Sequence, residues 1–243
     1  MIQIIEIFKQ AEQGFCKPFL CKGDDECFYY VKGFIDGQPQ RSDQIREWLC
    51  AHLAQALGLP IAEFCIVNIP EELFEVVPED AKKLGFGPAF ASKRVTGAVW
   101  MESHTMSNIA SKQLAMDILL FDYWVHNLDR TIGNPNLLVK AGTQQVKVID
   151  HNMAFDHEYN DDEFFTYHLF RDYKDQLFND IEVRAKYIAR LDEALAVFSL
   201  AKDSLPAEWQ WLDIEQSIQV DIDYATVWAI LNRYQQDQFW SMK

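Results

Sequence analysis

The feature that most constrains the fold is a change of pattern part-way along the chain. Residues 1 to about 95 hold seven of the ten glycines and have the pattern of short strands with one helix among them. From about residue 105 onward the apolar residues follow helical spacing, with one hairpin-like interruption. The sequence therefore predicts an α+β protein with a small antiparallel sheet at residues 1–95 and a mainly helical part at residues 96–243.

Apolar spacing and turn residues predict the individual elements. A helix is expected to begin at Ser42 or Asp43 and to end at Gly58, and Ser107 or Asn108 is expected to cap a second, longer helix. The expected strands are residues 27–32, 64–69 and 90–93, the expected hairpin is 137–140 with 146–149, and the expected longer helices are 42–57, 108–126 and 222–238.

Composition and charge narrow the class of protein. With 243 residues, 49% of them apolar, the chain can bury a core without disulfide or zinc staples. The 22 basic residues face 37 acidic ones, which gives a net charge of −15. Such a charge disfavours general binding to nucleic acid or to an anionic membrane surface. A single phosphate ligand held by one lysine and a metal ion remains compatible with it.

Cysteine usage and the apolar stretches predict a cytoplasmic protein without a membrane segment. The beginning of the chain carries Glu6 and lacks the pattern of a signal peptide. The longest apolar stretch, residues 115–125, is interrupted by Asp117 and Asp122. The cysteines are odd in number and form no CxxC pair, which favours reduced thiols: Cys16, Cys21, Cys27, Cys50 and Cys65.

Five polar residues have the types and places that phosphoryl transfer needs. Asp129 and Asn134 lie five residues apart on a loop between a long helix and a strand, and Asp150 ends the next strand. Upstream, Lys32 ends a strand and Glu47 lies on the helix that follows. A carboxylate orients the attacking hydroxyl, an amide and a second carboxylate hold Mg²⁺, and a lysine kept in place by a glutamate neutralises phosphate oxygens.

Simpler interpretations of these residues exist. Asp-Arg followed by Asn-Pro-Asn is common turn chemistry, and Glu47 on an exposed helix face would only be solvated. Several histidines suggest a zinc site, but they form no HExxH or other tight ligand pair: His126, His151, His157 and His168. The five polar residues taken together, in this order, favour the phosphoryl-transfer interpretation.

Longer segments resemble one kinase family. The sequence HNLDRTIGN at residues 126–134 looks like the catalytic loop of the kinase superfamily, and IDH at residues 149–151 looks like its metal-binding segment. The strings NLDRTIGNPNLLV and VIDHNMAF are most similar to the HipA-like kinases, an atypical bacterial branch. The resemblance covers roughly residues 10–210 and includes segments 30–32, 46–60, 90–97 and 206–209.

The resemblance implies a two-lobed, protein-kinase-like fold and a role for each residue. Lys32 would contact the nucleotide phosphates and Glu47 would pair with it. Asp129 would be the catalytic carboxylate, and Asn134 and Asp150 would bind Mg²⁺. The implied cofactors are ATP and Mg²⁺.

Some positions of the nucleotide site are open. The resemblance places the adenine near the backbone of Phe90, Ala91 and Ser92. Asn136 competes with Asn134 as the metal ligand, because Pro135 separates two amides that could each face the site. The chain has no GxGxxG loop, so that only residues 13–18 could cover the phosphates, and Asn152 replaces the glycine of the usual metal-binding segment.

The expected activity is transfer of the ATP γ-phosphate to a hydroxyl, and the expected acceptor is Ser or Thr in a protein. Two other hypotheses stay open, a small-molecule kinase and a nucleotide-binding pseudokinase that acts by binding a partner. Retention of all five polar residues argues against the pseudokinase, because an inactive binder does not need Asp129. A regulatory protein partner is a further expectation.

Overall fold

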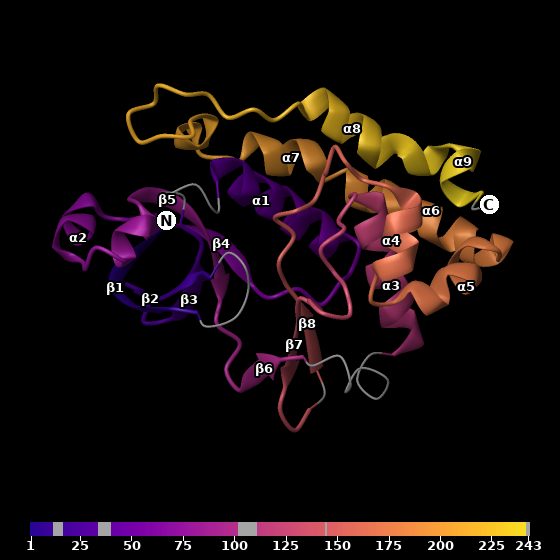
Figure 1. Ribbon diagram of the computed structural model, residues 1–243, viewed down its shortest axis with the longest axis horizontal. Coiled ribbons are helices and arrows are strands. Elements are labelled where there is room, and N and C mark those ends of the chain that lie inside the picture. Colours follow the sequence, from indigo (N-terminus) through magenta and orange to yellow (C-terminus); the bar gives the residue numbers. More distant parts are fainter. Residues whose placement is uncertain (12–16, 34–39, 102–110, 144, 242–243) are drawn as a thin grey trace. The chain divides into compact units, whose positions relative to one another are not determined.

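The computed structural model describes residues 1–11, 17–33, 40–101, 111–143 and 145–241 (Figure 1). The contacts within the chain form two compact units. Helix α1 (Arg41–Ala56) begins in the first unit and ends in the second. The first unit comprises Met1–Trp48, Ala62–Thr96 and Ser204–Ile222, and the second comprises Leu49–Ile61, Gly97–Asp203 and Asp223–Lys243.

The first unit contains a closed β-barrel with the strand order β1-β2-β3-β5-β4. Its neighbouring strands are antiparallel, except that β1 runs parallel to β4 through Ile2 opposite Val67 and Gln3 opposite Asn68. This parallel pair, which closes the barrel, differs from the antiparallel sheet that the sequence predicts. The strands are β1 (Ile2–Gln10), β2 (Phe19–Gly23), β3 (Phe28–Val31), β4 (Phe64–Ile69) and β5 (Gly87–Lys93).

The barrel interior is filled by alternate residues of its strands, because successive side chains of a strand point to opposite faces. Two short helical segments, α2 (Glu71–Val76) and η1 (Ala81–Leu84), connect β4 to β5. Ala81 and Leu84 belong to the same buried cluster as the interior side chains, which include Ile4, Phe19, Cys21, Tyr29, Val31, Val67, Ile69, Ala89 and Ala91.

Helix α1 follows the predicted pattern, with Ile45, Leu49 and Leu53 buried and Gly58 after its end at φ +86°. In the first unit, its buried Gln44 connects two strands. The Gln44 amide nitrogen donates to the carbonyl of Lys32 at 3.0 Å, and its amide oxygen accepts from the Phe90 N–H at 3.1 Å. A neutral side chain thereby fixes the end of β3 and the middle of β5.

The second unit is mainly helical and contains a three-stranded antiparallel sheet in the order β6-β7-β8. The predicted hairpin is present as β7 and β8. The strands are β6 (Ala98–Trp100), β7 (Leu137–Lys140) and β8 (Gln145–Val148); the helices are α3 (Lys112–Trp124), α4 (Asp161–Tyr167), η3 (Arg171–Tyr173), α5 (Lys174–Phe178), α6 (Ile181–Leu195), α7 (Phe198–Asp203), α8 (Tyr224–Asn232), η5 (Arg233–Gln235) and α9 (Asp237–Trp240). The short η4 (Ala207–Gln210) belongs to the first unit.

Two predicted helices of the second unit have different bounds. Ser111 caps α3 by accepting a hydrogen bond from the Leu114 N–H, and the expected caps at residues 107 and 108 lie outside the described residues. The predicted helix at 222–238 is divided into α8, η5 and α9. Side chains compete there for the carbonyls of the last turn, since Asn232 donates to Trp228 O and Arg233 to Ile230 O.

The described cysteines, Cys21, Cys27, Cys50 and Cys65, form no disulfide bond. Cys21 and Cys50 are buried, and the other two are partly exposed. Burial raises the pKa of the Cys65 thiol to about 11, which keeps it protonated at neutral pH. Within the described residues, no helix combines the length and the apolar composition that a membrane crossing requires.

Gly33 is expected to be intolerant of a side chain. A Cβ atom there would lie 2.4 Å from the Lys83 carbonyl oxygen and 2.8 Å from Leu84 Cα, both of them backbone atoms. Gly33→Ala should lower the free energy of unfolding by about 1–3 kcal/mol, as overpacking does. Gly133→Ala is the control, because its Cβ would meet only Thr131 Oγ1 at 3.9 Å. Urea titration followed by circular dichroism measures both; equal stability of the two variants would contradict the expectation.

Candidate active site

The first unit holds the predicted pair of charges. The Lys32 ammonium donates to the Glu47 carboxylate at 3.0 Å, and the side chains are 8% and 4% exposed. This confirms the predicted ion pair. Lys32 directly follows β3, and Glu47 lies three residues after Gln44 on α1, so that the two contacts between helix and strand support each other. The contact of Lys32 with nucleotide phosphates stays a prediction.

The backbone of Phe90, Ala91 and Ser92 pairs with neighbouring strands or bonds to Gln44 within the barrel. Strand β5 lies between β3 and β4, and all three residues have partners on both strands or on Gln44. The Phe90 carbonyl accepts from the Lys32 N–H at 3.2 Å. An adenine base would therefore have to meet the side chains of these residues or displace strand hydrogen bonds. Their contact with adenine stays a prediction.

The second unit brings together the other three predicted residues, Asp129, Asn134 and Asp150. One carboxylate oxygen of Asp129 accepts from the Asn134 amide nitrogen at 3.0 Å, and the other accepts from the Asn136 amide nitrogen at 2.9 Å. The Asp129 N–H donates to the Asn127 amide oxygen at 3.2 Å. The carboxylate is thus held from both sides in one orientation.

Electrostatics make Asp129 a stronger base than an exposed aspartate. Burial raises its pKa, and the neighbouring charge of Asp150 raises it further. The hydrogen bonds from Asn136 and Asn134 act in the opposite direction, and the pKa remains above its usual range. The repulsion also shows that Asp150 lies close enough to Asp129 for the two charges to interact.

Asp150 reaches this place through an extension of the β7–β8 hairpin. The Ile149 N–H donates to the Asn136 carbonyl at 3.1 Å, which continues the strand pairing up to the residue before Asp150. Asn136 and Asp150 both have left-handed backbone conformations, with φ of +49° and +62°. Asparagine and aspartate tolerate this conformation better than most residues with a side chain, and backbone strain of this kind is concentrated at functional sites.

The oxygen atoms around Asp129 fit a magnesium ion. Since the amide nitrogens of Asn134 and Asn136 both donate to Asp129, their amide oxygens are left as acceptors. The Asn136 Oδ1 atom is buried and has no hydrogen-bond partner among the described residues. With the Asp150 carboxylate, these are the hard oxygen ligands that Mg²⁺ prefers. The structure brings both asparagines to the site, so the choice between them stays open.

The described histidines do not form a zinc site. In the part of the chain that the structure describes, no three His, Cys, Asp or Glu side chains are placed to hold a metal ion together. The buried His168 is instead hydrogen-bonded to Asp122 at 3.1 Å, and His126 stacks on Tyr159 with ring centres 3.9 Å apart.

Three further residues hold the loop of Asp129 and were not predicted from the sequence: Asp122, Asn127 and Arg130. All three are buried. One signal was present: Asp122 interrupts an apolar stretch inside a helix, where a charge needs a buried partner. Arg130 gave no such signal, because an arginine in a polar loop usually lies in solvent.

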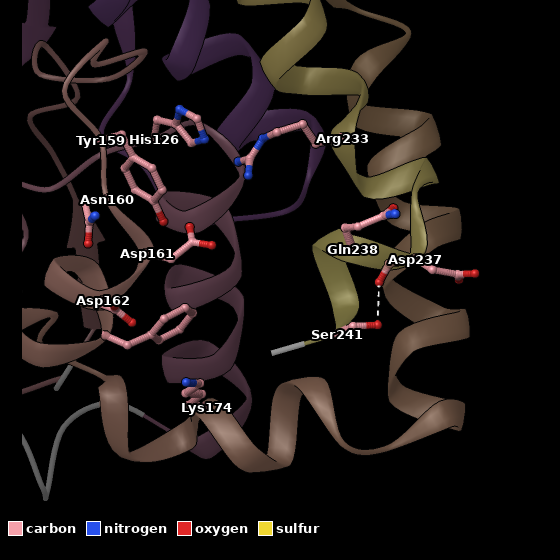
Figure 2. A pocket seen from close by; sticks show the side chains of 11 residues that line it. His126, Tyr159, Asn160, Asp161, Asp162, Lys174, Arg233, Asp237, Gln238 and Ser241 are labelled. Atoms are coloured by element: carbon pink, nitrogen blue, oxygen red, sulfur yellow. Dashed lines mark hydrogen bonds between the residues drawn. The ribbon is translucent and has the colours of Figure 1, made fainter. Parts of the chain in front are cut away.

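A separate pocket of about 780 Å³ lies in the second unit (Figure 2). Arg233 and the stacked rings of His126 and Tyr159 lie at one end of it, and Lys174 lies at the other. Its remaining charged side chains are aspartates: Asp161, Asp162 and Asp237. The walls therefore carry charges of both signs.

Comparison with known proteins identifies the family. A model of the HipA-like kinases matches residues 4–243, essentially the whole chain. The chain belongs to the HipA-like kinase family. It is therefore a kinase, which is a phosphotransferase. None of the curated proteins matches this HipA-like kinase in sequence.

Solved structures show the same fold as this HipA-like kinase at low sequence identity. The proinflammatory kinase CtkA of Helicobacter pylori is 12% identical with a TM-score of 0.58, over 95% of this chain and 91% of that chain. The Golgi casein kinase is 12% identical with a TM-score of 0.56, over 96% of this chain and 71% of that chain. Both similarities show a kinase fold.

Breaking the buried ion pair of this HipA-like kinase is expected to destabilise it. Lys32→Met removes the Lys32 cation from the buried Glu47 charge, and breaking a buried pair in this way typically costs about 3–5 kcal/mol. The double variant Lys32→Met/Glu47→Met should recover most of that loss. Lys82→Met, which breaks the exposed pair with Glu79, is the control and should cost less than about 1 kcal/mol. Urea unfolding measures the series; a double variant no more stable than Lys32→Met would contradict the expectation.

Acid is expected to destabilise the second unit through His126. Burial lowers the pKa of His126 to about 3, below the value of about 6.5 in the unfolded chain. The unfolded state therefore binds the proton first, and the stability present above that value is lost as the pH falls. Between about pH 7 and 5 this amounts to at most about 2 kcal/mol.

His126→Phe keeps a flat ring beside Tyr159 and removes the titrating group. Its unfolding free energy should change less than that of the wild type over this pH range. His157→Gln, at an exposed position, should change as much as the wild type. If His126→Phe has the same pH dependence as the wild type, the histidine is not the responsible group.

Proposed function

We propose that this HipA-like kinase transfers the γ-phosphate of ATP, with Mg²⁺, to a hydroxyl group of Ser or Thr in a protein. The observation that carries the proposal is the Asp129 carboxylate. Two amide side chains hold it at 3.0 and 2.9 Å, and burial together with the Asp150 charge raises its pKa. A fixed carboxylate of raised pKa is suited to orient a hydroxyl and to take up its proton.

The reaction balances with Asp129 as the proton acceptor. The acceptor oxygen forms a bond to the γ-phosphorus while the bond from that phosphorus to the bridging oxygen of ATP breaks. The electron pair of the broken bond stays on ADP, and the hydroxyl proton moves to Asp129. Asn134 and Asn136 keep the carboxylate in place during this transfer.

The remaining predicted residues bind the nucleotide. Asp150 and Asn134 would hold Mg²⁺, with Asn136 as the alternative amide. The bound ion would neutralise charge on the phosphate oxygens. Lys32 would donate to the phosphates from its ion pair with Glu47.

The acceptor is tested with labelled ATP. The purified chain is incubated with γ-labelled ATP, Mg²⁺ and a cell lysate, and Asp129→Asn is the control. A labelled protein that yields phosphoserine or phosphothreonine on hydrolysis supports the proposal. A labelled metabolite would make the chain a small-molecule kinase, and no label beyond that of the control would make it a binding protein.

Asp129 and Asp150 should be separable by their substitutions. Asp129→Asn should lower kcat by about 10²–10⁴-fold with ATP affinity nearly unchanged, because a general base acts in the transition state. Asp150→Asn should also weaken Mg²⁺-dependent nucleotide binding, because it removes the charge that faces the ion. Turnover is measured together with calorimetric nucleotide affinity. Equal loss of affinity in both variants would make Asp129 a metal ligand, and unchanged turnover of Asp129→Asn would exclude it from catalysis.

A further inference from the structure

Arg130 contacts the backbone on both sides of the candidate metal site. It directly follows Asp129, and its side chain is fully buried. One guanidinium nitrogen, Nη1, donates to the carbonyls of Asn136 at 2.8 Å, Pro135 at 3.1 Å and Ile149 at 3.4 Å. Pro135 directly follows Asn134, and Ile149 directly precedes Asp150. A single side chain thus holds the two segments that carry the candidate metal ligands.

Asp122 holds the other edge of the guanidinium. Its carboxylate, fully buried at the end of α3, accepts from Arg130 Nε at 2.6 Å and from Nη2 at 3.4 Å. It also accepts from the Asn127 amide nitrogen at 2.9 Å, and the Asn127 oxygen in turn accepts from the Asp129 N–H. Asp122 therefore fixes the residues on both sides of Asp129 in the sequence.

His168 adds a third contact from the segment that follows Asp150. Its Nδ1 atom accepts from the Phe170 N–H at 3.1 Å, so the proton of the neutral ring is on Nε2, which faces Asp122 at 3.1 Å. The Leu169 N–H donates to the Arg130 carbonyl at 3.0 Å. The end of α4 is thereby attached to the loop of Asp129.

We propose that Arg130, held by Asp122 and His168, is a positioning residue that sets the separation of Asp129 from Asp150. The proposal rests on the proposed kinase function, in which these carboxylates face the acceptor hydroxyl and the metal ion. The hydrogen bonds of the Arg130 side chain go to the Asp122 carboxylate and to backbone carbonyls.

The shape of the guanidinium explains why arginine is needed here. Its flat fork directs donors at a carboxylate along one edge and at carbonyls along the other. A lysine ammonium is a single point that can keep the contact with Asp122 but cannot also reach the carbonyls of Asn136 and Ile149 in the same geometry. Loss of those bonds would let the two segments separate, and misplacement by about 1 Å can cost about 100-fold in rate.

Arg190, whose side chain is 31% exposed, provides a control in the same unit. Its Nη1 donates to Asp117 of α3 at 2.6 Å and its Nη2 to the Leu57 carbonyl at 2.7 Å, so it joins a helix carboxylate to a backbone carbonyl as Arg130 does. It makes no hydrogen bond to the loop of Asp129 among the described residues. Arg190→Lys therefore reports the general cost of replacing a forked arginine.

The experiment compares Arg130→Lys with Arg190→Lys by hydrogen exchange and by kinetics. Arg130→Lys should speed exchange of the Asp129 and Ile149 amides, lower kcat about 10- to 100-fold, and raise the Mg²⁺ concentration for half-maximal rate. Arg190→Lys should leave all three unchanged. Wild-type exchange and kinetics in Arg130→Lys, or equal effects in both variants, would overturn the proposal.

The exchange measurement separates this proposal from the proposed function. If the wild type transfers no phosphate, the proposed function fails, and exchange at Asp129 and Ile149 still decides whether Arg130 positions the loop. If Arg130→Lys does not fold, His168→Gln repeats the test, since its amide nitrogen can still donate to Asp122 while the ring Nδ1 that accepts from the Phe170 N–H is replaced. It should speed exchange at Asp129 in the same direction, and unchanged exchange would overturn the proposal.

Discussion

The charge of Asp122 is the constraint on which the second unit depends. A carboxylate with no exposed surface must be neutralised and hydrogen-bonded, or it would not stay ionised in the core. Burial alone would raise its pKa, but the charge of Arg130 and the hydrogen bond from His168 outweigh burial and hold the pKa well below its usual range. Since those partners lie on the loop of Asp129 and at the end of α4, neutralising one charge also determines where these segments lie.

The contacts of Asp122 and Arg130 also stabilise the loop of Asp129, which contains unfavourable features. Asp129 has a raised pKa because it is partly buried and lies near a second carboxylate, and Asn136 and Asp150 have left-handed backbones. Each feature lowers stability and persists only where the surroundings allow no alternative. The bonds from Arg130 to the carbonyls of Asn136 and Ile149 remove that alternative. The destabilising features are thus concentrated at the candidate active site.

Local patterns predicted well the elements whose apolar side chains show which face is buried. The strand 64–69 and the hairpin 137–148 are of this kind, as is helix α1, whose buried residues recur at helical spacing. Strand β1 was missed because exposed Ile5 and Phe8 obscure its alternation, and the break near Arg233 because side-chain competition for carbonyls is not visible in a periodicity. The proximity of Asp129, Asn134 and Asp150 was predictable from their types and order. Arg130 was not, since burial of a cation is decided by tertiary partners.

Each of the two units contains a buried charge that is neutralised within that unit. In the first unit Glu47 neutralises Lys32, and in the second Arg130 neutralises Asp122. A side chain with a buried partner has already lost most of its rotamer freedom, so little further ordering is needed when a ligand binds. Electrostatic groups that are fixed before the reaction are the ones that contribute most to catalysis. Each unit therefore carries charges that are fixed before a ligand binds, so that little binding energy would be used for ordering these residues.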